Sequence, residues 1–190
     1  MSANQHTKET FTNLDYSGKT IPARKFDTCI FKNCDFSKTN LSDFDFIDCT
    51  FENCNFSMTK MSNTALKSVF FNGCKLIGVD FSGCKDFLLS FRFEKCSLDY
   101  TVFSGKKIKK TTFADCLMRE ADLSFADLSE SVFHNCDLTR SVFNQTNIEK
   151  ADFRTAFNFS IDPELNRIKK AVFSPQGAIG LLDRYQIVIE

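Results

Sequence analysis

The nine cysteines have the widest chemical range of any residues in this 190-residue sequence, because a thiolate can bind zinc, attack a substrate or join a disulfide. Their spacing fits none of these uses. Cys29 and Cys34 are five residues apart, as are Cys49 and Cys54, and no C-x-x-C pair occurs. We therefore predict that the cysteines are small, reduced core residues that hold no metal and form no disulfide.

Histidine, the commonest general base, occurs only as His6 and His134. We place His6 in a terminal tail and His134, which follows Phe133, on the outside of the molecule. Neither has partners for a nucleophilic or acid–base site. The sequence also contains no P-loop and no dinucleotide-binding motif, so we expect no cofactor and no enzymatic activity.

The 23 phenylalanines indicate the architecture. One column of them recurs at intervals of 20, 20, 22, 20, 20 and 20 residues, and most apolar positions between them fall every five residues. An α-helix of period 3.6 cannot keep a period of five on one face, whereas a coil with four five-residue sides can. The sequence therefore predicts an all-β solenoid of stacked coils. The first column is Phe31, Phe51, Phe71, Phe93, Phe113, Phe133 and Phe153, and a second with the same intervals is Cys34, Cys54, Cys74, Cys96, Cys116 and Cys136.

Each five-residue side has two inward positions in this arrangement. The central one is large and apolar, and the one two residues earlier is small in most pentads, which is where all nine cysteines fall. A coil that closes on itself has room for only one large side chain per side. The remaining three positions are mostly polar and should face solvent. Gly (7) and Pro (3) are scarce, so the corners cannot depend on them.

These pentads resemble the pentapeptide-repeat family, whose consensus is A(D/N)LXX. ADLSFADLSESVF (residues 121–133) and CDFSKTNLSDFDF (residues 34–46) match it closely. The resemblance implies a right-handed quadrilateral β-helix of about seven coils, roughly 4.8 Å apart. We expect a flexible tail at 1–10, the β-helix at 11–160 and a small helical cap at 161–190.

Two interruptions of the pattern stand out. Two extra residues within 84–92 shift the register, and we predict a small bulge there. Lys106 falls at a small inward position, where a cation should not fit. We therefore expect residues 105–107 to bulge outward.

The C-terminal segment departs from the repeat. Asp162-Pro163 predicts a short helix to about Lys170, followed by one more pentad and, after Ser174-Pro175, a second helix. Residues 187–189 read as a terminal strand. In the simpler interpretation this segment only caps the end of the β-helix. In the alternative interpretation it is a cap that also forms a two-fold dimer contact. The residues assigned to it are Ala178, Ile179, Leu181, Leu182, Tyr185, Ile187 and Ile189.

Charge is balanced overall, with 24 basic and 24 acidic residues, but it is banded along the chain. Residues 60–110 are mainly basic and the segments on either side mainly acidic. The banding is either ordinary solvated surface or complementarity to a partner. No apolar run is long enough for a membrane span and the start has no signal-peptide pattern, so we expect a cytoplasmic protein.

The resemblance extends to quinolone-resistance (Qnr) proteins, which implies a homodimer that binds DNA gyrase and topoisomerase IV by mimicking DNA. An adaptor for an unrelated protein partner is the alternative. Direct nucleic-acid binding through the basic band is a weaker third hypothesis, because the chain is not basic overall. The candidate partner surface consists of Glu120, Asp122, Asp127, Glu130, Phe87 and Leu89.

Overall fold

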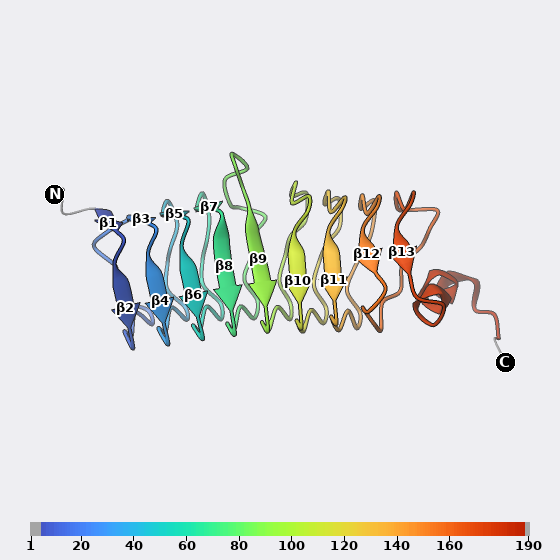
Figure 1. Cartoon of the computed structure of the whole chain (residues 1–190), viewed down its shortest axis with the longest axis horizontal. Helices are drawn as coiled ribbons and strands as arrows, with labels where there is room; N and C mark the ends of the chain where they lie inside the picture. The colour runs from blue at the N-terminus through green and yellow to red at the C-terminus, as the bar shows by residue number, and fades with distance from the viewer. Residues whose placement is uncertain (1–4, 189–190) are drawn as a thin grey trace.

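The computed structural model describes residues 5–188 and shows a four-sided β-helix, with stacked coils along one axis (Figure 1). Every strand pair in its two sheets is parallel, and partners are 20 residues apart except at one step of 22. The remaining two sides are held by isolated parallel bridges such as Asp35↔Asn55 and Asp122↔Val142. One sheet contains β1 (Gln5–Thr7), β3 (Lys25–Asp27), β5 (Asp45–Ile47) and β7 (Ala65–Lys67). The other contains β2 (Thr10–Thr12), β4 (Ile30–Lys32), β6 (Thr50–Glu52), β8 (Val69–Asn72), β9 (Phe91–Glu94), β10 (Thr112–Ala114), β11 (Val132–His134), β12 (Asp152–Phe153) and β13 (Val172–Phe173).

The phenylalanine column forms the axis of the core, as the period predicts. The rings of Phe31 and Phe51 are stacked 4.8 Å apart and those of Phe113 and Phe133 5.0 Å apart. All seven members are essentially inaccessible to solvent. The ring spacing follows the spacing of hydrogen-bonded strands, so packing and backbone pairing impose the same repeat.

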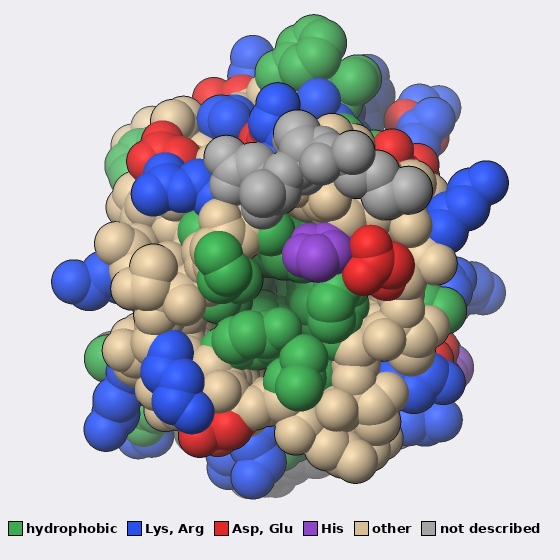
Figure 2. Space-filling model, turned by 90° about the vertical axis from the view of Figure 1, so that its left-hand side faces the viewer, with side chains coloured by type: hydrophobic (Ala, Val, Ile, Leu, Met, Phe, Trp, Pro, Cys, Tyr) green, Lys and Arg blue, Asp and Glu red, His purple; other side chains and the backbone are tan. Residues whose placement is uncertain are grey.

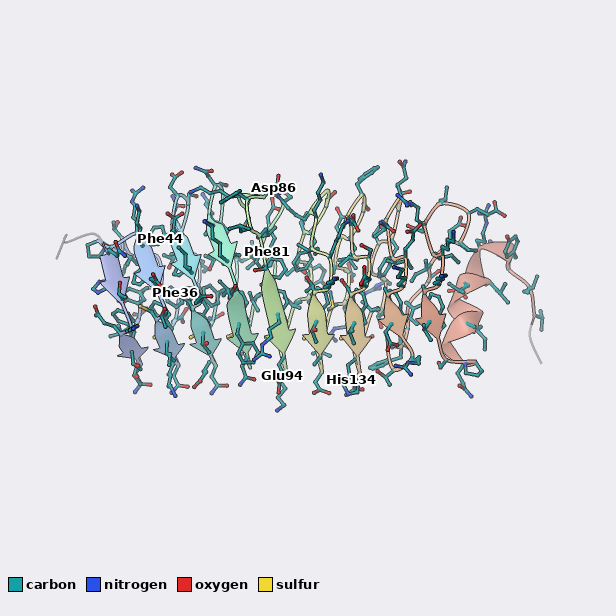
Figure 3. All side chains as sticks on the ribbon, turned by 45° about the horizontal axis from the view of Figure 1, so that its top comes forward. Phe36, Phe44, Phe81, Asp86, Glu94 and His134 are labelled. Carbon is teal, nitrogen blue, oxygen red and sulfur yellow. The ribbon has the colours of Figure 1, made fainter. Side chains whose placement is uncertain are left out.

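The small inward residues satisfy their polar atoms on the preceding coil. The Cys54 thiol donates to the Phe31 carbonyl (3.5 Å), and the Thr59 hydroxyl donates to the Phe36 carbonyl (2.7 Å). A small polar side chain therefore adds a link between coils without needing buried water. Phe44 also occupies such a position and is buried, which shows that a large residue can fit where its neighbours allow (Figure 3).

The corners explain why glycine is rare. At most of them the residue two after the central position has a positive φ, such as Asn33 (52°) and Lys38 (56°). This conformation costs a non-glycine residue roughly 1–2 kcal/mol. Many of these residues donate their N–H to the next coil, such as Asn33 to Glu52 at 2.8 Å and Lys38 to Ser57 at 3.0 Å, which offsets part of that cost.

The prediction of a tail through residue 10 is wrong for residues 5–10. β1 pairs with β3 and β2 with β4, and the His6 ring stacks on Phe26 at a centroid distance of 5.4 Å. A polar sequence forms strands here because the coil below supplies the hydrogen-bond partners. Figure 2 looks onto this end, where hydrophobic side chains gather at the centre within a polar and charged rim.

The helix predicted from Asp162 to Lys170 is also absent. The segment forms another coil instead, in which Arg167 bridges to Asn147 and the buried Asn166 amide donates to the Phe143 carbonyl at 3.0 Å. Asp162 does accept the N–H of Glu164, so the capping signal makes a turn rather than a helix. The β-helix thus extends to β13 and exceeds the predicted seven coils.

A short cap follows β13 and covers the C-terminal coil (Figure 1). It consists of two 3₁₀ helices, η1 (Gly177–Leu181) and η2 (Asp183–Tyr185). Ser174 accepts the N–H of Gly177 at 3.0 Å in the turn that leads into η1. The N-cap residue of η1 is Gln176, which makes no side-chain capping bond, so the Ser174 signal forms a turn before a 3₁₀ helix and does not cap an α-helix. Ile187 and Val188 are not in a strand, and Ile189 lies outside the described residues. Within residues 5–188 no helix is long and apolar enough to cross a membrane.

Replacing Phe113 with alanine should destabilise the protein by about 3–5 kcal/mol, because the cavity interrupts the ring stack between Phe93 and Phe133. Denaturant unfolding followed by circular dichroism measures this. Phe125, which is 55% exposed, is the matched control, and Phe125→Ala should change stability little. A loss below about 1 kcal/mol for Phe113→Ala would mean that the column is not the core.

Candidate functional site

The coil at residues 84–92 is the one place where the strand register moves by 22 rather than 20 residues within the described chain. Its loop rises above the other coils between β8 and β9, with Asp86 at its outer edge (Figures 1 and 3). At the tip, Phe87 is 72% exposed and Leu88 63% exposed. Two large adjacent apolar side chains in solvent are unusual on a surface that is otherwise mostly polar.

The loop is anchored at both ends. Lys85 donates its N–H to Thr64 at 2.9 Å, and Ser90 donates its N–H to Leu66 at 2.9 Å. Leu89, which we expected on the partner surface, is buried in the core. It turns inward because the interrupted side still needs an apolar residue to fill the coil. Of these three apolar residues, the insertion thus moves only Phe87 and Leu88 out of the core. The spacing of apolar residues in the sequence could not show which of the three would remain buried.

Lys106 does not bulge outward as predicted. Its side chain occupies the inward position and is 6% exposed, while the backbone around it keeps the repeat, with Lys106 donating to Phe103 and accepting from Asp127. The ammonium donates to the Cys84 carbonyl and to the Asp86 carboxylate, both at 2.7 Å. The cation fits because the irregular coil supplies two acceptors.

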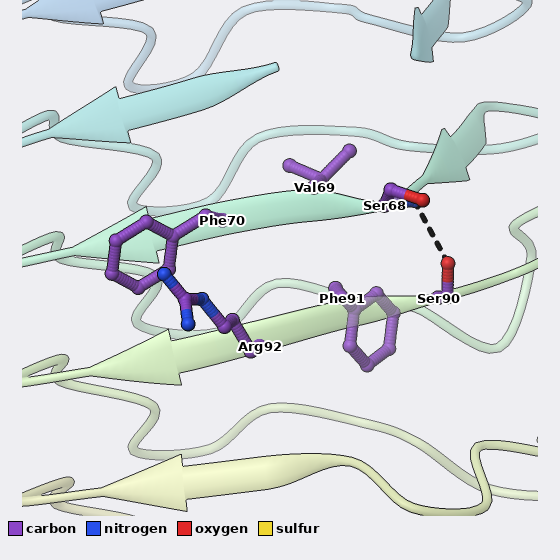
Figure 4. Close-up of a pocket in the computed structure, with 6 residues that line it drawn as sticks. All are labelled: Ser68, Val69, Phe70, Ser90, Phe91 and Arg92. Atoms are coloured by element: carbon purple, nitrogen blue, oxygen red, sulfur yellow. Dashed lines mark hydrogen bonds between the residues drawn. The ribbon is translucent and has the colours of Figure 1, made fainter. Parts of the chain in front are cut away.

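A shallow groove of about 310 Å³ lies next to the loop, between β8 and β9 (Figure 4). The Arg92 guanidinium stacks over the Phe70 ring at 3.8 Å, and Ser90 accepts the N–H of Ser68 at 2.8 Å. On the loop side, the Lys67 ammonium lies 5.0 Å from the Phe87 ring. The groove and loop therefore combine apolar surface with cations held over aromatic faces. The groove is lined by Ser68, Val69, Phe70, Ser90, Phe91 and Arg92.

The four candidate acids do not form a free acidic patch. Arg140 pairs with Glu120, Lys109 with Asp127 (3.2 Å), and Lys110 with Glu130 (3.7 Å). The two residues of each pair are 18–20 residues apart in the sequence and lie on adjacent coils. Ion pairs at the surface contribute little to stability, but they neutralise the local electrostatic potential.

The carboxylate of the fourth acid, Asp122, stabilises the turn that follows it in the chain, because it accepts the N–H of Ser124 at 2.9 Å. Asp122 also lies on a different side of the β-helix from Asp127, as their separate bridges to Val142 and Asn147 show. The structure therefore does not bring the acidic candidates together as one surface.

Basic residues gather instead on one side of the β-helix. It is the side that holds β1, β3, β5 and β7, and the basic residues lie on its C-terminal half, at residues 107–170. The bridges Lys107↔Asp127, Asp127↔Asn147 and Asn147↔Arg167 align these coils. Basic side chains outnumber acidic ones there, although several are paired. The basic set is Lys107, Lys109, Lys110, Lys150, Arg167, Lys169 and Lys170, against Asp127, Glu130 and Glu149.

The cap residues divide into two groups. Ala178 and Leu181 are half-buried, and Leu181 packs against the core, whereas Ile179, Leu182, Tyr185 and Ile187 are exposed. The cap is held by Ile161, which donates its N–H to Gly180 at 3.0 Å. Only glycine fits at 180, because a Cβ there would collide with the Phe159 carbonyl. Arg184 also pairs with Asp162 at 2.6 Å. A firmly docked cap thus presents an apolar outer surface.

The cysteines and histidines occupy the predicted kinds of position, with one exception. All nine cysteines are buried with free thiols, and His134 is exposed, its ring 3.2 Å from the Thr155 hydroxyl (Figure 3). His6 is the exception, since it belongs to β1. Residues 5–188 contain no group of three or more His, Cys, Asp or Glu side chains placed to hold a metal ion.

Two family models match the chain, one for a pentapeptide repeat region over residues 24–103 and one for eight pentapeptide repeats over residues 116–154. The chain belongs to the pentapeptide-repeat family. QnrB1, a plasmid-mediated fluoroquinolone resistance protein, is 20% identical, with a TM-score of 0.61 over 97% of this chain and 100% of that one. HetL, a pentapeptide-repeat protein involved in heterocyst differentiation regulation in the cyanobacterium Nostoc, is 12% identical, with a TM-score of 0.56 over 90% of this chain and 87% of that one. No curated protein matches the sequence. At these identities the solved structures establish the fold.

Alkaline pH should destabilise the protein through its buried thiols. Burial raises the pKa of Cys49 and Cys84 from 9.0 to about 12. The neutral thiol is therefore favoured in the folded state, so its stabilisation is complete below about pH 9 and is lost as the pH rises towards 12. We expect the free energy of unfolding, measured in denaturant, to fall between pH 8 and pH 10.5 in both the wild type and Cys49→Ala. The fall should be roughly 1–2 kcal/mol smaller in Cys49→Ala, because that variant lacks one of the buried thiols. Identical pH dependence of the two proteins would contradict this.

Proposed function

We propose that the protein is a non-catalytic protein-interaction module whose contact surface is the loop tip, Phe87 and Leu88, together with the adjoining groove. The exposure of these two apolar residues on an otherwise periodic rod is the observation that carries the proposal. Apolar side chains that are held in place in solvent suit recognition, because little conformational entropy is lost when a partner covers them.

DNA gyrase or topoisomerase IV is the partner that we infer from the similarity to QnrB1, with protection from quinolones as the outcome. Mimicry of DNA by an acidic face receives less support, since Glu120, Asp127 and Glu130 all pair with cations. We therefore assign recognition to the loop and treat charge as secondary. The apolar outer surface of the cap is proposed as the contact of a homodimer, and nine reduced thiols suit a cytoplasmic location.

An adaptor for an unrelated protein partner is the second candidate. HetL shows that the same fold serves a protein with a regulatory role in another setting. The basic set on the side of the rod, which includes Lys107, Lys150 and Lys170, would then favour a partner with an acidic surface.

Gyrase supercoiling with and without ciprofloxacin, across a titration of the protein, separates the two candidates. The gyrase proposal predicts restored supercoiling with the wild type, and roughly a tenfold or greater loss of potency when Phe87 and Leu88 are both replaced by alanine. Phe125→Ala, which removes another exposed phenylalanine on a different part of the rod, should retain full potency. Absence of any effect by the wild-type protein on the enzyme from its own source would reject gyrase and leave the adaptor.

The dimer proposal predicts that replacing Ile179 and Ile187 with aspartate yields a monomer in sedimentation experiments, while the wild type sediments as a dimer. Val142→Asp, at an equally exposed site on the side of the rod, is the control and should leave the dimer intact. A monomeric wild type would reduce the segment to a simple cap.

A further inference from the structure

Lys106 is the only charged side chain in its inward column that is buried within residues 5–188. Its neighbours along the column, Thr64, Cys84, Ala126 and Thr146, are all small or apolar. A buried ammonium is strongly unfavourable unless it is fully hydrogen-bonded and paired. The surroundings of Lys106 must therefore compensate for its charge.

Both compensating groups belong to the irregular coil. The Lys106 ammonium lies 2.7 Å from the Cys84 carbonyl, at the base of the loop, and 2.7 Å from the Asp86 carboxylate, next to its tip. Within the Lys106–Asp86 ion pair, the two side chains differ sharply in exposure, since that of Asp86 is 74% exposed and that of Lys106 only 7%. The cation thus connects the buried column to the outer loop.

The contact with Cys84 replaces a bond of the regular repeat. In ordinary coils the carbonyl of this inward residue accepts an N–H from the next coil, as Thr64 accepts from Lys85 and Lys106 accepts from Asp127. At Cys84 the Lys106 ammonium is the donor instead. A side chain therefore restores the acceptor bond at the coil that the insertion distorts.

We propose that Lys106 is a positioning residue that locks the loop at residues 85–90, and that this lock holds Phe87 and Leu88 in their outward arrangement. Asp86 immediately precedes Phe87, so fixing its carboxylate restricts the backbone leading into the tip. Leu89 on the inner side and Lys67 above the Phe87 ring complete the support. The role of the lock in partner binding rests on the proposed function, whereas the lock itself does not.

The Cys84 thiol provides a direct reporter, because it is buried at the base of the loop and should react only when the loop opens. In the full-length protein, Lys106→Met should increase the rate of thiol modification at Cys84 about tenfold or more, as mapped by mass spectrometry. Amides of residues 85–90 should exchange faster as well. Cys49, equally buried in an earlier coil, should remain protected, and Lys107→Met, at the exposed neighbouring lysine, should behave as the wild type.

Substitutions at Asp86 test the lock without disturbing the core, even if Lys106→Met fails to fold. Asp86→Ala should accelerate modification of Cys84 and leave Cys49 unchanged. Asp86→Glu keeps the carboxylate on an exposed side chain with room for one more methylene, and it should restore protection. Unchanged Cys84 reactivity in Asp86→Ala, or failure of the glutamate to restore it, would overturn the proposal.

The partner assay is read separately. If the wild type protects gyrase, Asp86→Ala should weaken protection and Asp86→Glu should restore it. Full protection by an Asp86→Ala protein whose loop has opened would show that the lock does not serve binding. If the wild type does not act on gyrase, the proposed partner fails, and the reactivity of Cys84 still decides whether the lock exists.

Discussion

Every coil of this protein must close in a fixed number of residues, so that its backbone hydrogen-bonds to the coils on either side. That constraint acts on all four sides at once. Phe31, Phe51 and Phe71 stack at about the strand spacing because the ladder places them there, and the stacked rings in turn fill the axis of the rod. Core packing and backbone pairing therefore select the same period of 20, and the αL corners are tolerated because many of them contribute a bond to the ladder.

The coil at residues 84–92 has two residues too many for this constraint. The structure accommodates them by moving Phe87 and Leu88 outward, turning Leu89 inward and placing the Lys106 ammonium where a backbone donor would otherwise be. Each adjustment lies within the coil or directly beside it, and the strands on either side, β8 and β9, resume full pairing. A solenoid confines a disturbance to neighbouring coils, and so a loop can be added without altering the rest of the rod.

The period alone was sufficient to predict the fold, the phenylalanine column and the burial of the cysteines, because each depends on a pattern repeated along the chain. The errors arose where local signals competed with the stack. Asp162-Pro163 resembles a helix start, yet the segment pairs with the preceding coil through Asn166 and Arg167. Residues 5–10 look unstructured, yet β3 and β4 provide partners for them.

The candidate site was predictable only in part. The position of the insertion follows from the spacing, but which residues leave the core does not, because Phe87, Leu88 and Leu89 are similarly apolar. Lys106 was placed correctly at an inward position and wrongly expected to leave it, since its acceptors lie 20 and 22 residues away and exist only once the irregular coil has formed.

We infer that the repeated closed coils stabilise the protein and that the irregular coil does not. Deleting Lys85 and Asp86 while replacing Lys106 with alanine restores a 20-residue coil, with Leu88 at its central position. The free energy of unfolding of this variant is the most direct measurement. We expect a folded protein at least as stable as the wild type. A loss of more than about 3 kcal/mol would contradict it, because the irregular coil would then be part of what stabilises the fold.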